Sequence, residues 1–61
     1  MIAPIVYTNA ELGIESRITE TVDGRFHVTL RDTDADQVFP SSLITPDLAM
    51  AKAIAASWVA D

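Results

Sequence analysis

The fold is decided by the last part of the chain, residues 45–60, which read TPDLAMAKAIAASWVA. Thr45 is a good N-cap, Pro46 suits the first helical position, and Asp47 places negative charge at the positive end of the helix dipole. After these residues nearly every position holds a helix former, and neither Gly nor Pro interrupts the run. The sequence therefore predicts a helix that begins at Thr45 and continues to Ala60.

The predicted helix has two faces that could make contacts. At 100° per residue, one arc of about 140° collects the large apolar side chains and is expected to face the core. These residues are Leu48, Ala51, Ile54, Ala55, Trp58 and Val59. A second stripe of alanines recurs at spacings of four, three and four, which would let another helix lie alongside. These alanines are Ala49, Ala53, Ala56 and Ala60, and they form the predicted interaction site. Because alanine has the best helix propensity, an exposed alanine face can equally be an ordinary way to make a short helix.

Upstream of the helix, residues 14–22 and 26–31 alternate apolar and polar side chains, which is typical of two strands. The Asp-Gly dipeptide between them indicates a hairpin, but a two-residue loop would set the apolar side chains of the two strands on opposite faces. A three-residue loop with Gly24 in a left-handed conformation instead pairs Ile18 with Val28 on one face. We therefore favour the three-residue loop.

Two further segments complete the predicted sheet. Residues 2–8 have β-branched and aromatic character, and Pro4 limits them to an edge strand or a loosely attached terminal arm. Residues 37–40 predict another strand, after which the serines at 41–42 are expected to form the turn before the helix. Strands first and a helix last predict a single α+β domain over residues 1–61. Its expected architecture is a three- to four-stranded antiparallel β-meander with one C-terminal α-helix packed on one face.

The composition is that of a small acidic globule. Hydrophobic residues make up 49% of the 61 residues, which is ordinary for a folded domain. Nine acids against four bases give a net charge of −5, and this argues against nucleic acid as a partner because nucleic-acid binders present clustered Lys and Arg. The absence of cysteine is compatible with a reducing cytoplasm, and the apolar start of the chain is too short to cross a membrane. We expect a cytoplasmic protein.

The small size of the chain favours association. A domain of about 60 residues buries only about 60% of its unfolded surface, and natural chains of this length usually add disulfides, a metal or oligomerisation. Because cysteine is absent and no strong metal motif is present, we expect a homodimer or a complex with a protein partner.

The only candidate metal ligands are the carboxylates of Asp32, Asp34 and Asp36, whose alternate spacing resembles the opening of an EF-hand calcium loop. The resemblance ends at Gln37, where that loop needs Gly, and at Leu43, where it needs a bidentate Glu. A solvated turn whose aspartates cap their own backbone is the favoured interpretation. No metal or other cofactor is expected.

Catalytic residues are not predicted. His27 is the only histidine, and the sequence fixes no nucleophile beside it. The two glycines lie in separate turns and leave no phosphate-binding loop. We expect neither an enzyme nor a binder of small-molecule substrates.

Two stretches of the sequence together resemble the pattern of a known protein family. Residues 23–32, DGRFHVTLRD, followed by residues 45–49, TPDLA, resemble the hairpin-to-helix core of HicB-type antitoxin domains, over about half of the chain. In such domains a strand pair around an Asp-Gly turn precedes a Thr-led, alanine-rich helix. The chain has Arg-Asp-Thr-Asp at 31–34 where the family has a Pro-Asp-Leu-Pro-Gly-like segment. The resemblance implies a dimerising, non-catalytic module that binds a protein partner.

Taken together, the residues predict a small non-catalytic acidic protein-interaction module that is dimeric. The alternative is an acidic inhibitor or nucleic-acid mimic that occupies a basic site on its target, through the aspartates at 32, 34 and 36.

Overall fold

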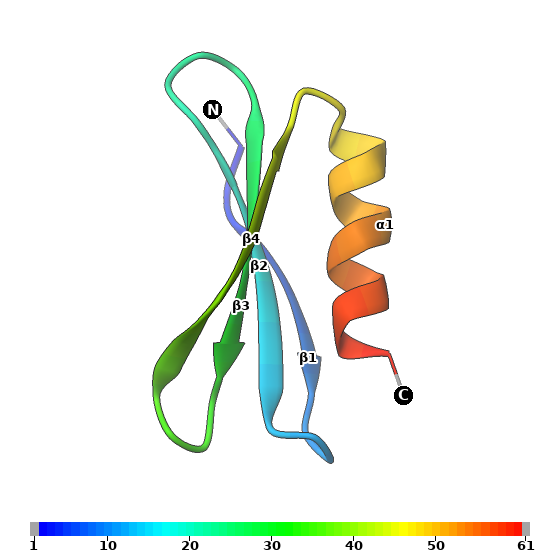
Figure 1. Ribbon diagram of the computed structural model, residues 1–61. Coiled ribbons are helices and arrows are strands. Elements are labelled where there is room, and N and C mark those ends of the chain that lie inside the picture. The colour runs from blue at the N-terminus through cyan, green and yellow to red at the C-terminus, as the bar shows by residue number, and fades with distance from the viewer. Residues whose placement is uncertain (1, 61) are drawn as a thin grey trace.

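The structure is a computed structural model that describes residues 2–60 and consists of two layers, a four-stranded sheet and one helix (Figure 1). The strands follow one another across the sheet in chain order, all antiparallel, and the helix lies on one face. This is the predicted α+β meander. Its elements are β1 (Ile5–Asn9), β2 (Ile14–Glu20), β3 (Phe26–Asp32), β4 (Gln37–Thr45) and α1 (Leu48–Val59).

The β2–β3 hairpin has the predicted register. Ile18 lies opposite Val28, and the backbone N–H of Thr21 donates to the carbonyl of Arg25 at 2.7 Å, which closes a three-residue loop. Gly24 has a φ of 84°, in the left-handed region that glycine adopts without strain. The apolar pattern of the two strands therefore predicted the correct loop length.

The core lies between the helix and the central strands. The fully buried apolar side chains are those of Ile18, Val28, Ala51 and Ala55. Around them pack the partly buried side chains of Ile5, Tyr7, Phe26, Leu48, Ile54 and Trp58. This distribution confirms the predicted inner face of the helix except at Val59, which is not among the residues of this cluster. Ser16 is also fully buried, and its hydroxyl donates to the carbonyl of Ala55 at 2.7 Å, so that a polar contact ties β2 to α1 inside the core.

β1 resolves the alternative that the sequence left open for the start of the chain. It begins directly after Pro4 and forms an edge strand, with Ile5 opposite Ile18. Ile5 and Tyr7 alternate inward and pack against the core. Residues 5–9 are therefore part of the sheet, and the predicted start of this strand at residue 2 is wrong.

The helix begins later than predicted. Its N-cap is Asp47, whose carboxylate accepts a hydrogen bond from the N–H of Ala49 at 2.9 Å. Thr45 is the last residue of β4, and its hydroxyl accepts from the N–H of Asp47 at 3.3 Å. The prediction that Thr45 is the N-cap and Pro46 the first helical residue is wrong, because pairing with β3 holds Thr45 in an extended conformation.

β4 is longer than predicted. The sequence indicated a strand only over residues 37–40 and a turn at 41–42, but β4 continues through these serines, so the predicted turn is wrong. A register shift places three residues of β4, at 39–41, opposite Leu30. Such a bulge at a sheet edge accommodates Pro40, which has no N–H to donate to a ladder. The proline interrupts the regular pairing without ending the strand.

A backbone hydrogen bond connects the β1–β2 turn and the β3–β4 turn, which lie at the same end of the sheet. The N–H of Thr33 in the β3–β4 turn donates to the carbonyl of Gly13 in the β1–β2 turn at 2.9 Å. Gly13 has a φ of 66°, and a Cβ atom there would collide with the carboxylate of Asp34. The positive φ favours glycine at this position, whereas the carboxylate of Asp34 lies at the end of a flexible side chain that could move aside.

Candidate interaction surface

The predicted alanine stripe lies where the sequence placed it. Ala49, Ala53, Ala56 and Ala60 are exposed on the side of α1 and its C-cap that faces away from the sheet. Their side chains are small, so a partner that covered them would bury little apolar area. The stripe by itself offers weak binding.

The aspartates of the β3–β4 turn have separate partners. The carboxylate of Asp32 accepts hydrogen bonds from the N–H groups of Asp34 at 3.0 Å and Ala35 at 3.1 Å, as expected for a turn that caps its own backbone. Asp36, which has a φ of 53°, forms an ion pair with Arg31. Within residues 2–60, no group of three or more acidic, His or Cys side chains is arranged to hold a metal ion. The structure therefore brings the three predicted carboxylates near one another without making them converge.

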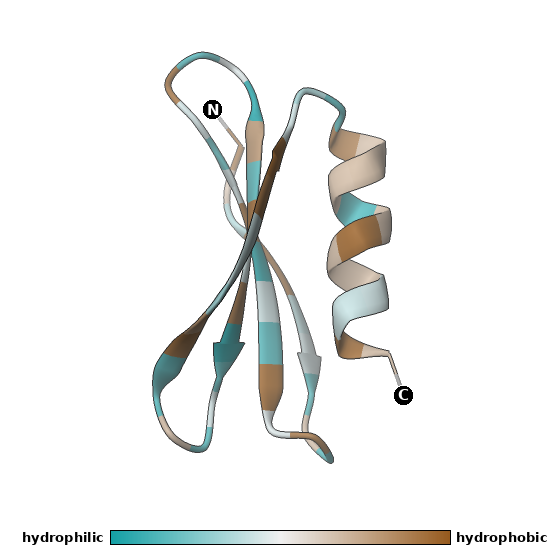
Figure 2. Cartoon of the chain, in the orientation of Figure 1, coloured by the Kyte–Doolittle hydropathy of each residue, from teal (hydrophilic) through white to brown (hydrophobic). Residues whose placement is uncertain are grey.

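β4 carries an exposed apolar surface that the sequence pattern did not predict. Because α1 packs mainly on β2 and β3 and contacts β4 least, β4 is exposed along its whole length except at Thr45. Figure 2 shows apolar residues near both ends of this strand. They are Val38, Phe39, Leu43 and Ile44, whose exposed fractions are 68%, 37%, 37% and 53%.

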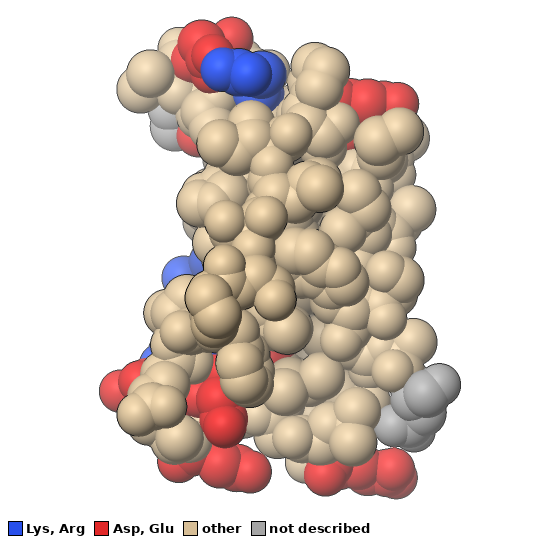
Figure 3. All heavy atoms as spheres, in the orientation of Figure 1, with Lys and Arg blue, Asp and Glu red and all other residues tan. Residues whose placement is uncertain are grey.

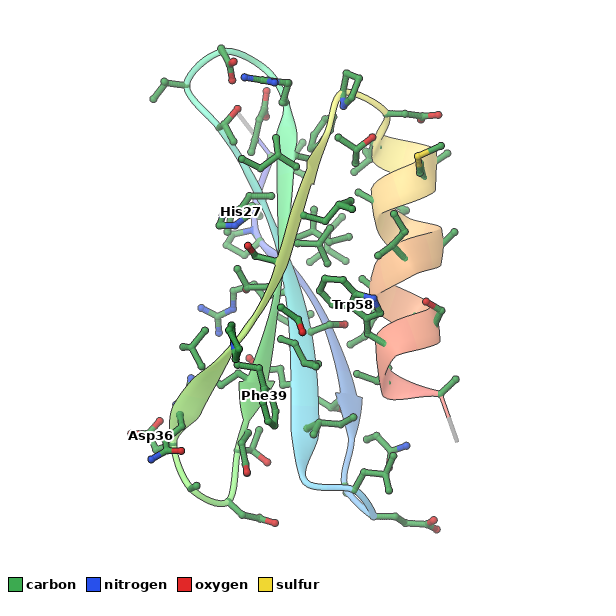
Figure 4. The ribbon with its side chains drawn as sticks, in the orientation of Figure 1. His27, Asp36, Phe39 and Trp58 are labelled. Carbon is green, nitrogen blue, oxygen red and sulfur yellow. The ribbon has the colours of Figure 1, made fainter. Side chains whose placement is uncertain are left out.

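The side chains of β4 project to both faces of the sheet. Leu43 lies opposite Val28, so it points to the face that carries the helix. Ile44 lies opposite His27 and points to the other face, which the helix does not cover. Figure 4 shows His27 directed away from the helix, and Phe39 on the side of β4 toward the helix.

A stripe on α1 continues this apolar surface. Met50, Ile54 and Trp58 recur every four residues, so they lie one above another along the helix. The hydroxyl of Thr45 contacts the sulfur of Met50 at 3.7 Å, which identifies this stripe as the side of α1 next to β4. Met50 is 53% exposed, and Ile54 and Trp58 are partly buried. We call these side chains together the β4–α1 surface: Phe39, Leu43, Met50, Ile54 and Trp58.

The β4–α1 surface is uncharged. None of the nine residues of β4 carries a charge, although the chain as a whole has a net charge of −5. Figure 3 shows this side of the molecule, on which the charged side chains gather near the two ends and at the margin away from the helix. An exposed, apolar, uncharged edge strand is unusual, because natural proteins commonly place charges on edge strands to prevent pairing with other chains.

The uncovered face of the sheet has a different character. A shallow depression of about 260 Å³ on this face is lined by Glu15, Arg17, Thr29, Arg31, Asp36 and Val38. Arg17 pairs with Glu15 at 3.3 Å and Arg31 pairs with Asp36, so the charges in the depression balance. Arg31 and Asp36 are 41% and 77% exposed, and such surface pairs contribute little free energy, while Glu15 in the other pair is 15% exposed.

The β2–β3 loop has one shifted acid. A hydrogen bond from the hydroxyl of Thr21, and a second from Arg25, lower the pKa of Asp23 from 3.8 to about 2. Arg25 and Asp23 also form an ion pair at 2.8 Å, in which both side chains are more than half exposed. The contacts of Asp23 lie within the loop and fix its shape.

Comparison of the chain with protein-family models, with curated proteins and with solved structures found no match. No helix in the described part of the chain is long and apolar enough to cross a membrane.

A sequence signal for the missed surface does exist. Residues 37–45 read QVFPSSLIT, an uncharged run with apolar pairs at 38–39 and 43–44 in a chain where one residue in five is charged. The proline and the two serines in its middle have the composition of a loop, which conceals the strand. The absence of charge in this run indicated the exposed apolar surface better than its loop-like composition did.

Proposed function

We propose that this protein is a non-catalytic interaction module that binds a protein partner through the β4–α1 surface. The observation that carries the proposal is the uncharged edge strand β4, which exposes apolar side chains on both faces next to the apolar stripe of α1. A non-catalytic role is supported by the three arginines, each of which pairs with a carboxylate near it in the chain instead of surrounding a reacting position with the others. The absence of cysteine supports a cytoplasmic setting.

The physics of this surface favours a protein chain as the ligand. An edge strand presents backbone N–H and C=O groups to which an extended partner segment can add as another strand, and the apolar side chains on either side supply burial. Removing apolar surface from water contributes about 25 cal/mol per Å². Because the surface carries no charge, binding through it should depend weakly on salt.

A second candidate function is the acidic inhibitor, in which one end of the molecule occupies a basic site on a target. The observation in its favour is the hydrogen bond between Thr33 and Gly13, which gathers the β1–β2 and β3–β4 turns at one end, together with their acids. These acids are Glu11, Asp32, Asp34 and Asp36. Binding by this end should weaken strongly as salt is added, because exposed charges are screened.

Affinity capture with tagged protein, in an extract of the cells that make it, separates these candidates. Met50→Asp should abolish capture, because it places a charge in the apolar surface. An acid in the first turn of a helix is favourable, so the variant should remain folded. Replacing Asp32, Asp34 and Asp36 by Asn should leave capture intact. Capture that survives Met50→Asp but fails after the three Asn substitutions would exclude the proposed module in favour of the inhibitor.

The matched control is the double change Ala53→Glu and Ala56→Glu in the exposed alanine stripe of the same helix. These charges face solvent, so capture should be unaffected. Loss of capture with this variant, and not with Met50→Asp, would assign binding to the alanine stripe and overturn the proposal.

A further inference from the structure

We infer that the partner of the β4–α1 surface is a second copy of this chain, joined by antiparallel pairing of the two β4 strands about a two-fold axis. The two sheets then form one eight-stranded sheet with both helices on the same face. This inference rests on the proposed function and specifies its partner.

The charge distribution favours self-contact at this surface. Two copies that each carry −5 repel each other, and the repulsion is smallest where the contact contains no charge. β4 meets this condition along its nine residues. The uncovered sheet face does not, because Glu15, Arg17 and Arg31 lie on it.

The outer edge of β4 is open. Within residues 2–60, β3 is its only neighbouring strand, and the other edge strand of the sheet, β1, has five residues instead of nine. A strand that pairs with its own copy gives a self-complementary interface, as a two-fold dimer requires.

The bulge determines which part of β4 can pair. Pro40 has no N–H, and residues 39–41 depart from the regular ladder. Regular pairing is therefore expected within residues 42–45, and an axis at Leu43 keeps the pairs nearest the axis inside this stretch. With the axis at Leu43, Ser42 of one copy lies opposite Ile44 of the other.

This register also keeps like faces together. Residues directly opposite each other in a sheet point to the same face. If Leu43 pairs with its own copy, the helix-facing side chains of the two copies lie on one face of the joined sheet. Pairing shifted by one residue would place the two helices on opposite faces and separate the apolar side chains.

A stable dimer needs more area than the paired strands alone supply. A standard interface buries about 800 Å² per partner, roughly a fifth of the 3936 Å² of this chain. The short regular ladder is too small to supply this area, so the side chains beside it must also be covered. Phe39 and Met50 lie beside the ladder on the helix-bearing face, and Figure 4 shows Phe39 and Trp58 both on this side of the sheet.

Disulfide trapping tests the inference, because the chain has no cysteine and single-Cys variants report one position each. At the axis, the two Cα atoms of Leu43→Cys should lie about 5 Å apart, within the range that a disulfide spans. In Ser42→Cys the two positions are diagonal, about 7–8 Å apart, and should link poorly. We expect Leu43→Cys to form a covalent dimer under mild oxidation, while Val6→Cys, on β1, forms no covalent dimer.

A second test measures the mass of the protein in solution and does not require a disulfide bond. Light scattering from low micromolar to millimolar concentration should show a mass that rises to that of a dimer for the unmodified chain and remains that of a monomer for Ile44→Asp. Val6→Asp is the matched control, because Val6 is similarly exposed on the same face but at the other edge, and its mass should still rise to that of a dimer.

Three outcomes would overturn the inference: a monomeric mass for the unmodified chain at every concentration, preferential linking of Ala53→Cys, or a dimeric mass for Ile44→Asp. The proposed function is tested separately, since a monomer that still loses capture with Met50→Asp would retain the interaction surface and exclude only the second copy as its occupant.

Discussion

The centre of the sheet and its β4 edge are built alike but are covered differently. Ile18 in β2 and Ile44 in β4 are both apolar strand residues, yet Ile18 is fully buried and Ile44 is 53% exposed. The difference arises because a single helix of twelve residues covers the central strands and contacts β4 least. The centre therefore supplies stability, while the edge keeps apolar surface available for a partner.

The largest expected effect comes from making the same change in both regions. Ile18→Ala should lower the free energy of unfolding by about 2–5 kcal/mol, because it leaves a cavity in the core. Ile44→Ala should cost less than about 1 kcal/mol in the monomer, because the side chain is already in water. Chemical denaturation at a concentration where the protein is monomeric measures both. Equal losses would show that β4 is as buried as the centre.

The start of the helix gives the next largest effect. Asp47→Ala should cost about 0.5–2 kcal/mol, because it removes the acceptor for the N–H of Ala49. Asp47→Asn should cost little, since asparagine caps helices about as well. Thermal unfolding followed by circular dichroism compares the two variants. If Asp47→Ala melted like the unmodified chain, Asp47 would not be the N-cap.

The buried polar contact between β2 and α1 should have a smaller effect. Ser16→Ala removes the hydrogen bond to the carbonyl of Ala55 and should lower the free energy of unfolding by about 0.5–1.5 kcal/mol. Ser42→Ala, on exposed β4, serves as the control and should change stability by less than about 0.5 kcal/mol. A larger loss at Ser42 than at Ser16 would reverse the assignment of core and edge.

The smallest expected effect on stability is in the β2–β3 loop, where it can be measured by titrating the carboxyl group of Asp23. The pKa of Asp23 is lowered from 3.8 to about 2, so the charged carboxylate favours the folded state. This contribution is present above pH 3.8 and is lost as the pH falls through about 2. Chemical shifts should report this pKa for the unmodified chain and a higher one for Thr21→Val. An unchanged pKa in that variant would exclude the Thr21 hydroxyl as the main cause.

The sequence alone predicted those features of the fold that depend on the spacing of apolar residues along the chain. The alternation of apolar residues selected the pairing of Ile18 with Val28 over the pairing that the Asp-Gly dipeptide suggests, and the periodicity of the helix identified its inner face. In both cases a shift by one position would move apolar side chains out of the core, so few arrangements were consistent with the pattern.

The sequence alone did not predict the conformation of segments that is set by contacts with residues far away in the chain. Thr45 has the properties of an N-cap, but pairing with Phe26 retains it in β4. Pro40 and the serines after it have the composition of a turn, but the edge of the sheet and a bulge accommodate them in a strand. The position of α1 over the centre of the sheet, which exposes β4, was likewise set by packing that no local pattern encodes.

Amide hydrogen exchange measured residue by residue at increasing protein concentration tests the central claim most directly, that β4 is the surface available for association. We expect protection to rise with concentration at residues 42–45 and to remain constant in β1 and at the alanines of α1. Protection that rises at Ala53 and Ala56 while β4 is unchanged, or that does not depend on concentration anywhere, would contradict this account.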